Sequence, residues 1–352
     1  MSEQGAARVG EFIFVPANSV DDGNLIAFAA LIWPEHPDPK KILSSWWRRA
    51  EPKCAVAAVH EATGAVAGVC AGLPCAWVIA GQLHAAIAIS VWYVSPHYAG
   101  KGLGKRLVQQ FEAPDVFMYT FSISDAAVAN FTKLGWVGPH GSFLMVLPLP
   151  RLAAIPLRLL RRGDLDFQEY TVDSAKLPAS LAADLDRIEA GRRHGGAHMR
   201  RGADDWSWHL SVAGARGYRF CIARRGGEPV GFVAVRRVTP GSSNQLGRVK
   251  AALIADLATV NDDPVVLRAL AGKAVAGASD LRAAIVLTAT TVLAHRKALS
   301  GLGFVSPATP VLGRFLQRRA PRFMWVPRGV ASGFTADSLA LTFVDSDLDF
   351  SL

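Results

Sequence analysis

The sequence predicts a mixed α/β fold that is built twice along the chain, each half having a sheet flanked by helices. Apolar, β-branched segments alternate with segments of helical periodicity over the 352 residues, a length that favours two domains. A tryptophan pair, a strand, a turn and a returning strand follow one another in both halves. These are Trp46, Trp47, 55–60 and 66–71 in the first half, and Trp206, Trp208, 218–223 and 230–236 in the second.

The remaining elements follow from local signals. In the first half we expect a strand at 11–15, a helix at 22–31 with Asp21 or Asp22 as N-cap, and strands at 77–79, 84–94 and 116–121. In the second half we expect a strand at 252–257, a helix from Pro264 and a short strand at 339–344. The segment 148–163 is rich in proline and arginine and predicts a linker or an edge strand. We therefore divide the chain into domains 1–150 and 167–352, joined by a linker at 151–166.

The composition excludes several classes of protein. Apolar residues make up 51% of the chain and charged residues 19%, so packed cores are expected rather than disorder. The net charge is +9, but the basic residues occur as scattered pairs such as Arg48-Arg49 and Arg161-Arg162, without a long basic run. We expect a solvated basic face and no nucleic-acid partner.

The cysteines and the apolar stretches indicate the compartment. Cys54, Cys70, Cys75 and Cys221 form no CxxC pair and are expected to be reduced, with neither a disulfide framework nor a metal site. The N-terminus has no signal-peptide pattern, so we expect a cytoplasmic protein. The apolar region 64–94 is interrupted by glycine, proline and histidine, which favours buried strands over a membrane span.

The stretch 90–108, SVWYVSPHYAGKGLGKRLV, carries the chemistry. It predicts a strand, a glycine-rich turn and a helix. Gly100, Gly102 and Gly104 allow a close approach of the backbone to a ligand, and the amides of such a turn bind phosphate groups. Lys101 and Lys105 add positive charge. The spacing fits neither the dinucleotide fingerprint nor a Walker loop.

This stretch resembles the acyl-CoA-binding motif of the GNAT acetyltransferase superfamily. The segment 124–136, SDAAVANFTKLGW, is similar to a second motif of that family, which in its usual form contains a tyrosine and ends in Gly-Phe. The resemblance implies two tandem GNAT-like domains, each with a mixed, largely antiparallel sheet, and acetyl-CoA or another acyl-CoA as co-substrate, without a metal. It implies that Tyr93 and Val94 contact pantetheine. The residues implied to hold the pyrophosphate are Gly100, Lys101, Gly102, Leu103, Gly104 and Lys105.

The sequence departs from the family where proton transfer is concerned. Phe131 replaces the frequent tyrosine that reprotonates the departing thiolate, Ser124 replaces a frequent asparagine, and Ala99 replaces a frequent arginine or glutamine. Either another side chain supplies the acid, or solvent does, or the first half is not catalytic. The candidates are Tyr119, Ser122 and Ser124 as acids, and Ser90, His84 and His97 as relays to a base.

The second half resembles a degenerate copy. Where a glycine loop is expected it has TVNDDP, in which Asp262 and Asp263 would repel a pyrophosphate. Its segment 295–304, HRKALSGLGF, still resembles the family's closing helix. We expect one acyl-CoA site per chain, with the second half as a structural partner or a wall of the substrate cleft. Asp345, Asp347 and Asp349 near the end are expected to form a solvated tail.

The acceptor is the least determined part. Trp33, Glu35 and His36 could bind an amine, or could belong to a surface loop. The resemblance implies direct attack of a small-molecule amine, such as an amino sugar, in a ternary complex. The alternatives are a protein-directed acyltransferase and a non-catalytic acyl-CoA-binding module. Two stacked halves would suit a monomer that forms an internal pseudo-dimer, and a homodimer is the alternative.

Overall fold

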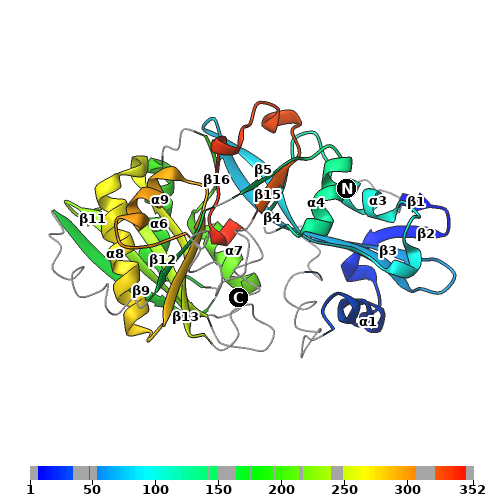
Figure 1. Ribbon diagram of the computed structural model, residues 1–352, viewed down its shortest axis with the longest axis horizontal. Helices are drawn as coiled ribbons and strands as arrows, with labels where there is room; N and C mark the ends of the chain where they lie inside the picture. Colours follow the sequence, from blue (N-terminus) through cyan, green and yellow to red (C-terminus); the bar gives the residue numbers. More distant parts are fainter. Residues whose placement is uncertain are drawn as a thin grey trace.

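Two mixed sheets with flanking helices form the molecule (Figure 1). The computed structural model describes residues 7–34, 47, 54–121, 123–141, 143–148, 164–174, 176–192, 196–213, 217–238, 249–306 and 322–345. None of the helices in these ranges is long and apolar enough to cross a membrane.

The first sheet runs in the order β1-β2-β3-β4-β5-β6-β15-β7, and β10 and β16 extend it beside β4. Its longest pair, β4 and β5, is an antiparallel hairpin in which Ile79 pairs with Gln82. The strands are β1 (Ala7–Val9), β2 (Phe12–Pro16), β3 (Ala55–His60), β4 (Val66–Ile79), β5 (Gln82–Val94), β6 (Phe117–Phe121), β7 (Val137–Gly141), β10 (Ala197–Met199), β15 (Arg322–Trp325) and β16 (Leu339–Ala340).

Helices cover both faces of the first sheet. Leu103, Leu107 and Phe131 pack on one face from α3 (Leu103–Gln109) and α4 (Asp125–Lys133). On the other face, α1 (Asp22–Ile32) packs against the sheet. The Asp21 side chain caps α1 by accepting a hydrogen bond from the N–H of Asn24 at 3.1 Å, as the sequence predicted. The two strands expected at 66–71 and 77–79 are one continuous strand.

The second sheet runs in the order β8-β14-β13-β12-β11-β9. Helices α6 and α7 lie on the face that shares a core with the first sheet, and α8 and α9 lie on the opposite face. The strands are β8 (Phe143–Pro148), β9 (Leu165–Val172), β11 (Tyr218–Arg225), β12 (Glu228–Val238), β13 (Ala251–Thr259) and β14 (Ile285–Thr290). The helices are α6 (Ala179–Gly191), α7 (Ala203–Ala213), α8 (Pro264–Asp280) and α9 (Leu293–Ser300). Short 3₁₀ turns are η1 (Ala17–Ser19), η3 (Pro96–Tyr98), η4 (Val260–Asp262), η5 (Gly329–Ala331), η6 (Ala336–Ser338) and η7 (Phe343–Asp345).

The two halves exchange strands. β8 follows β7 in the chain but leaves the first sheet and pairs with β14 at the edge of the second sheet. β15, near the end of the chain, enters the first sheet between β6 and β7, where Trp325 pairs with Tyr119 and with Val137. Each sheet therefore depends on a strand from the other half. The division into 1–150, 151–166 and 167–352 stays a prediction, and no local pattern in the sequence indicates the exchange of strands.

Asp345 corrects one expectation. It belongs to η7 and is buried with 2% exposure, so it is not part of a solvated tail. The strand expected at 339–344 is limited to β16. Asp347 and Asp349 lie outside the described residues.

We predict that Trp325→Ala destabilises the whole molecule. Trp325 is 1% exposed, and removing a buried tryptophan side chain costs about 3 to 5 kcal/mol. Because Trp325 comes from the second half but completes the first sheet, thermal unfolding should stay a single transition at a lower temperature. Leu83→Ala, at a 57% exposed position in β5, is the control and should leave the transition in place. Two separate transitions in Trp325→Ala would contradict the exchange.

Candidate active site

The centre of the site is the point where β5 and β6 part. The two strands pair in parallel at three positions, of which Ala88 with Tyr119 is the last, and β5 continues to Val94. Ser90 is an extra residue in the β4–β5 ladder, where the register shifts. Such a bulge bends a strand. Within the described ranges, no strand pairs with the β6-facing edge of 89–94. We call this edge the open edge.

A glycine loop follows the open edge. Gly100 and Gly102 have φ values of +82° and +74°, in the left-handed region that favours glycine. A Cβ at either position would meet no atom within 4 Å. The N–H groups of 100–102 donate to no backbone carbonyl in the described part of the chain. Consecutive amides of this kind, beside open space, suit a phosphate group.

Gly104 serves packing rather than access. A Cβ there would lie 3.1 Å from the Trp92 ring, and Trp92 Nε1 donates to the Gly104 carbonyl at 3.0 Å. This contact fixes α3 against β5. The ring of Phe131 lies 4.5 Å from Trp92 and 4.4 Å from Trp136, centroid to centroid. The position expected to hold an acid is thus part of an aromatic cluster.

The two loop lysines differ in their surroundings. Lys101 forms an ion pair with Glu11, and its ammonium lies 5.2 Å from the ring centre of Phe12. Hydrogen bonds from Lys101 and then from His60 lower the pKa of Glu11. Lys105 is exposed on the first turn of α3. The backbone of the loop, rather than the Lys101 ammonium, therefore faces a ligand most directly.

The predicted cofactor residues Tyr93 and Val94 end β5, both half-buried. Tyr93 packs edge-on against Phe28 of α1, with 5.8 Å between ring centres. Their backbone belongs to the open edge, which leads to the glycine loop, and their contact with pantetheine stays a prediction.

The three predicted catalytic residues do not gather at one point. Tyr119 lies at the parting point and Ser90 in the bulge two residues beyond Ala88. Ser124 is the N-cap of α4, where its hydroxyl accepts a hydrogen bond from the N–H of Ala127 at 3.3 Å. Ser122 lies outside the described residues. The catalytic assignment stays a prediction, with Tyr119 and Ser90 best placed.

The predicted acceptor residues contribute one described side chain. Trp33 is half-buried against Trp47, with 5.8 Å between ring centres. Glu35 and His36 lie outside the described residues. Their role in acceptor binding stays a prediction.

A pocket of about 350 Å³ opens at the parting point and was missed by the sequence reasoning. Ala88 and Tyr119 line it from the first sheet, and most of its polar lining comes from the second half. That polar lining consists of Arg200, Asp204, Asp205, His209 and Asp345. Trp208 is half-buried and also lines the pocket. No sequence signal joins positions that are separated by over 80 residues.

Tyr119 and Cys75 are two neutral polar groups at the parting point. The Tyr119 hydroxyl donates to the carbonyl of Asp345 at 3.0 Å and lies 3.8 Å from the Cys75 sulfur. Burial raises the pKa of Tyr119 well above its usual value, and burial raises the pKa of Cys75 to about 12. Both groups keep their protons at neutral pH, so neither acts as an anionic nucleophile.

Carboxylates outnumber cations in this pocket. Asp204 and Asp205 lie beside one guanidinium, Arg200, which binds Asp205 at 2.7 Å and 3.0 Å, whereas the carboxylate of Asp345 pairs with Arg201. Burial raises the pKa of Asp205 although Arg200 opposes this effect. In the described part of the chain, no three His, Cys, Asp or Glu side chains gather as metal ligands.

The second half has no counterpart of the glycine loop. Asp263 caps α8 by accepting from the N–H groups of Val265 and Val266 at 2.9 Å and 3.3 Å, and it also pairs with Arg225 at 3.0 Å. A carboxylate thus occupies the place that a phosphate would need. The helix expected from Pro264 and the loss of the loop are confirmed.

Residues 24–136 match the sequence model of the Acetyltransferase (GNAT) family. These residues form a GNAT domain. Both motifs quoted from the sequence lie within the match, and the second half repeats the mixed sheet of the GNAT domain without its glycine loop. None of the curated proteins compared is similar in sequence to the chain.

Solved structures share the fold over nearly the whole chain. A tandem GNAT protein from the clavulanic acid biosynthesis pathway is 16% identical, with a TM-score of 0.51 over 90% of this chain and 98% of that one. Saccharomyces cerevisiae N-myristoyltransferase with bound myristoyl-CoA is 10% identical, with a TM-score of 0.54 over 92% and 85%. The glucosamine N-acetyltransferase region of a fungal multi-domain β-N-acetylglucosaminidase is 13% identical, with a TM-score of 0.56 over 92% and 38%. At these sequence identities, the similarity shows that the fold is shared.

We predict that Gly102→Glu abolishes acetyl-CoA binding, measured by calorimetry. A side chain at φ +74° strains the loop, and a carboxylate repels a phosphate. Gly226→Glu is a matched control, because Gly226 also has a positive φ, +57°, and open space around it, but lies in the β11–β12 turn. Equal loss of binding in both variants would contradict the loop assignment.

We also predict that Asp263→Ala lowers the free energy of unfolding by about 1 kcal/mol, the usual cost of losing an N-cap. Partial burial would raise the pKa of Asp263, but Arg225 and the two N–H groups outweigh it, so the pKa is lowered on folding. Its stabilisation is therefore present above the unfolded pKa of about 3.9 and is lost as pH falls through the folded pKa. Denaturant titrations at pH 7 and pH 3 should show the difference between wild type and variant shrinking in acid. Exposed Asp166→Ala is the control and should show neither effect.

Proposed function

We propose that the chain transfers an acyl group, in the first place acetyl, from coenzyme A to the amine of a small acceptor, by direct attack in a ternary complex. One observation carries the proposal: the pair Ala88 and Tyr119 ends the contact of β5 with β6 and also lines the 350 Å³ pocket. The open strand edge leads from this point to the glycine loop. A cofactor along the edge would present its acyl group to the pocket.

The open edge and the loop together suit coenzyme A. The pantetheine arm is an extended chain with two amides, which can pair with the backbone of 89–94, including Tyr93 and Val94. Six residues of strand span about 20 Å, so the arm would link the parting point to a pyrophosphate at 100–105. The fold shared with a myristoyl-CoA-bound enzyme supports an acyl-CoA in this position.

The reaction needs one proton to move. The amine nitrogen attacks the thioester carbonyl, the C–N bond forms, the C–S bond breaks, and a proton passes from nitrogen to sulfur to give an amide and a free thiol. A tyrosine whose pKa lies well above 10 holds its proton more tightly than a thiol of pKa about 8.5. The one proton of Tyr119 is donated to the Asp345 carbonyl at 3.0 Å, so the Tyr119 oxygen accepts a hydrogen bond from the attacking amine and positions it, rather than acting as a proton source. The proton reaches sulfur directly or through water.

The pocket charge favours a cationic amine as acceptor. Asp204 and Asp205 exceed Arg200 in charge, on a chain whose net charge is +9. An amine would arrive as an ammonium and pass one proton to solvent, and the neutral amine would then attack. An amino sugar is one candidate, supported by the fold of the fungal glucosamine N-acetyltransferase region.

The test combines binding and turnover. Acetyl-CoA is titrated by calorimetry, and thiol release is followed with glucosamine, putrescine and spermidine. Binding of one acetyl-CoA per chain with thiol release from any acceptor supports the proposal. Binding without release supports a non-catalytic module, for which the apolar Phe131 gives a reason, or a protein acceptor. Absence of binding overturns the proposal.

We predict that Tyr119→Phe lowers kcat by about 10-fold to 100-fold, as loss of a group that positions the attacking amine does, and leaves the Kd of acetyl-CoA unchanged. Tyr170→Phe is the matched control. It removes a hydroxyl that donates to Asp184 at 3.4 Å, from β9 in the second half. An unchanged kcat in Tyr119→Phe would exclude this hydroxyl from the reaction.

A further inference from the structure

The second sheet repeats the parting of strands seen in the first. β13 pairs in parallel with β14 at three positions, from Ala251 with Ile285 to Leu253 with Leu287, and continues to Thr259. The register of the β12–β13 ladder shifts and leaves Ala255 as an extra residue, as Ser90 is in β5. The second half therefore has the geometry of an acyl slot.

The chain fills this slot with its own residues 339–345. The N–H of Thr291 donates to the Leu341 carbonyl at 3.0 Å, and the N–H of Leu341 donates to Thr291 Oγ1 at 2.8 Å. Thr342 bridges to Thr290, and its hydroxyl donates to Asp256 at 2.9 Å. The slot is thus occupied from within, in addition to lacking its phosphate loop.

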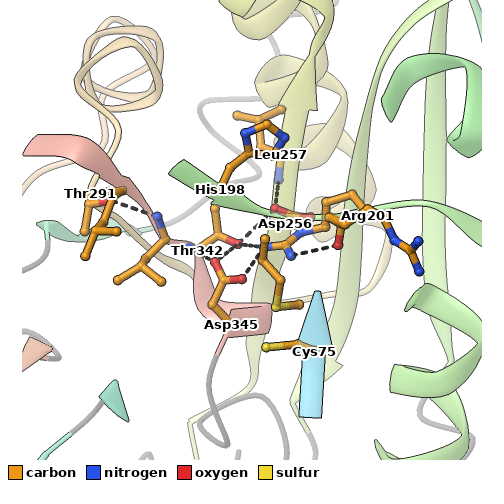
Figure 2. A network of polar contacts seen from close by, with 12 residues as sticks. Cys75, His198, Arg201, Asp256, Leu257, Thr291, Thr342 and Asp345 are labelled. Atoms are coloured by element: carbon orange, nitrogen blue, oxygen red, sulfur yellow. Dashed lines mark hydrogen bonds and ion pairs between the residues drawn. The ribbon is translucent and has the colours of Figure 1, made fainter. Parts of the chain in front are cut away.

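A buried cation fixes the filling segment. The Arg201 guanidinium lies between the carboxylates of Asp256, from β13, and Asp345, from the filling segment (Figure 2). The Arg201 side chain is 3% exposed and both carboxylates are fully buried. The fork of a guanidinium can hold two carboxylates at once, which an ammonium does poorly. Removing one partner of a buried ion pair leaves an uncompensated charge, so loss of Arg201 or of one carboxylate would strongly destabilise this contact.

The same residue, Asp345, reaches the first sheet. Its backbone carbonyl accepts the hydrogen bond of Tyr119, at the parting point of β5 and β6. A continuous chain of contacts thus runs from Asp256 through Arg201 and Asp345 to Tyr119. It links the filled slot of one half to the open slot of the other.

We propose that Arg201 and Asp256 are positioning residues for acyl transfer, which hold Asp345 so that its carbonyl orients the Tyr119 hydroxyl at the open slot. The second half, which lacks the glycine loop, thereby supports the site in the first half. This rests on the proposed function as far as turnover is concerned, but the placement of Tyr119 can be measured without turnover.

The kinetic test is a double-mutant cycle on Arg201 and Tyr119. With acetyl-CoA and the amine of the panel that releases most thiol, Arg201→Met should lower kcat about 10-fold, and Arg201→Lys should restore part of it. In the Tyr119→Phe background both changes should alter kcat by less than about twofold, because the group through which they act is gone. The Kd of acetyl-CoA should not change. If the fold-changes in kcat of the two single variants simply multiplied in the double variant, the two residues would act independently and the proposal would be overturned.

A chemical test works without any acceptor. Cys75 lines the pocket 3.8 Å from the Tyr119 hydroxyl, whereas Cys54, Cys70 and Cys221 are buried. Arg201→Met should raise the rate of Cys75 alkylation by N-ethylmaleimide, followed by mass spectrometry, about fivefold or more through greater local opening. Arg224→Met is the control, because it breaks the pair of Arg224 with Asp184 elsewhere in the second half. An unchanged rate in Arg201→Met, or an equal rise in the control, would overturn the proposal.

The two proposals fail separately. Absence of thiol release from wild type with every acceptor counts against the acyltransferase alone, and the alkylation rates still decide whether Arg201 positions Tyr119. If Arg201→Met does not fold, Arg201→Lys and the isosteric Asp256→Asn replace it in both tests. Circular dichroism and a thermal transition establish folding for every variant.

Discussion

The parallel pairing of β5 with β6 stops at Ala88 and Tyr119, and the site depends on this limit. Because β5 continues for six residues beyond the pair, its backbone edge lies open and leads to the glycine loop. The bulge at Ser90 bends the strand at the same place. Had the pairing continued, the edge would be satisfied by β6 and no extended ligand could bind there.

The exchange of β8 and β15 keeps the parting strands in place. β6 lies between β5 and β15, so it is held on its far side by a strand that comes from the second half. One hydrophobic core runs through both halves, with Trp77 and Phe117 from the first half and Trp206 and Phe232 from the second. The site of the GNAT domain is therefore built into a structure that neither half forms alone.

In the second half, the corresponding slot is filled by residues of the chain itself. Strands β13 and β14 still separate after Leu253, but acidic residues replace the glycine loop. Residues 339–345 fill the slot between the two strands. Asp345 ties that filling to Tyr119 across the junction. In this arrangement the ion network of Arg201 lies beside the separated strands and reaches the pocket through Asp345.

The sequence by itself determined the local features. Hydrophobic alternation, the N-cap Asp21, the glycines of the loop and the Asp263 cap act over a few residues. Their patterns predicted strands β2 to β6 and β11 to β13, helices α1 and α8, the loop and its loss in the second half. Only the tertiary structure decided which distant residues meet. Arg201, Asp256 and Asp345 carry no local signature, and β15 gives no sign of its partner, because both depend on contacts between segments over 50 residues apart. Register and strand exchange are set by packing of the whole core, which one sequence does not reveal.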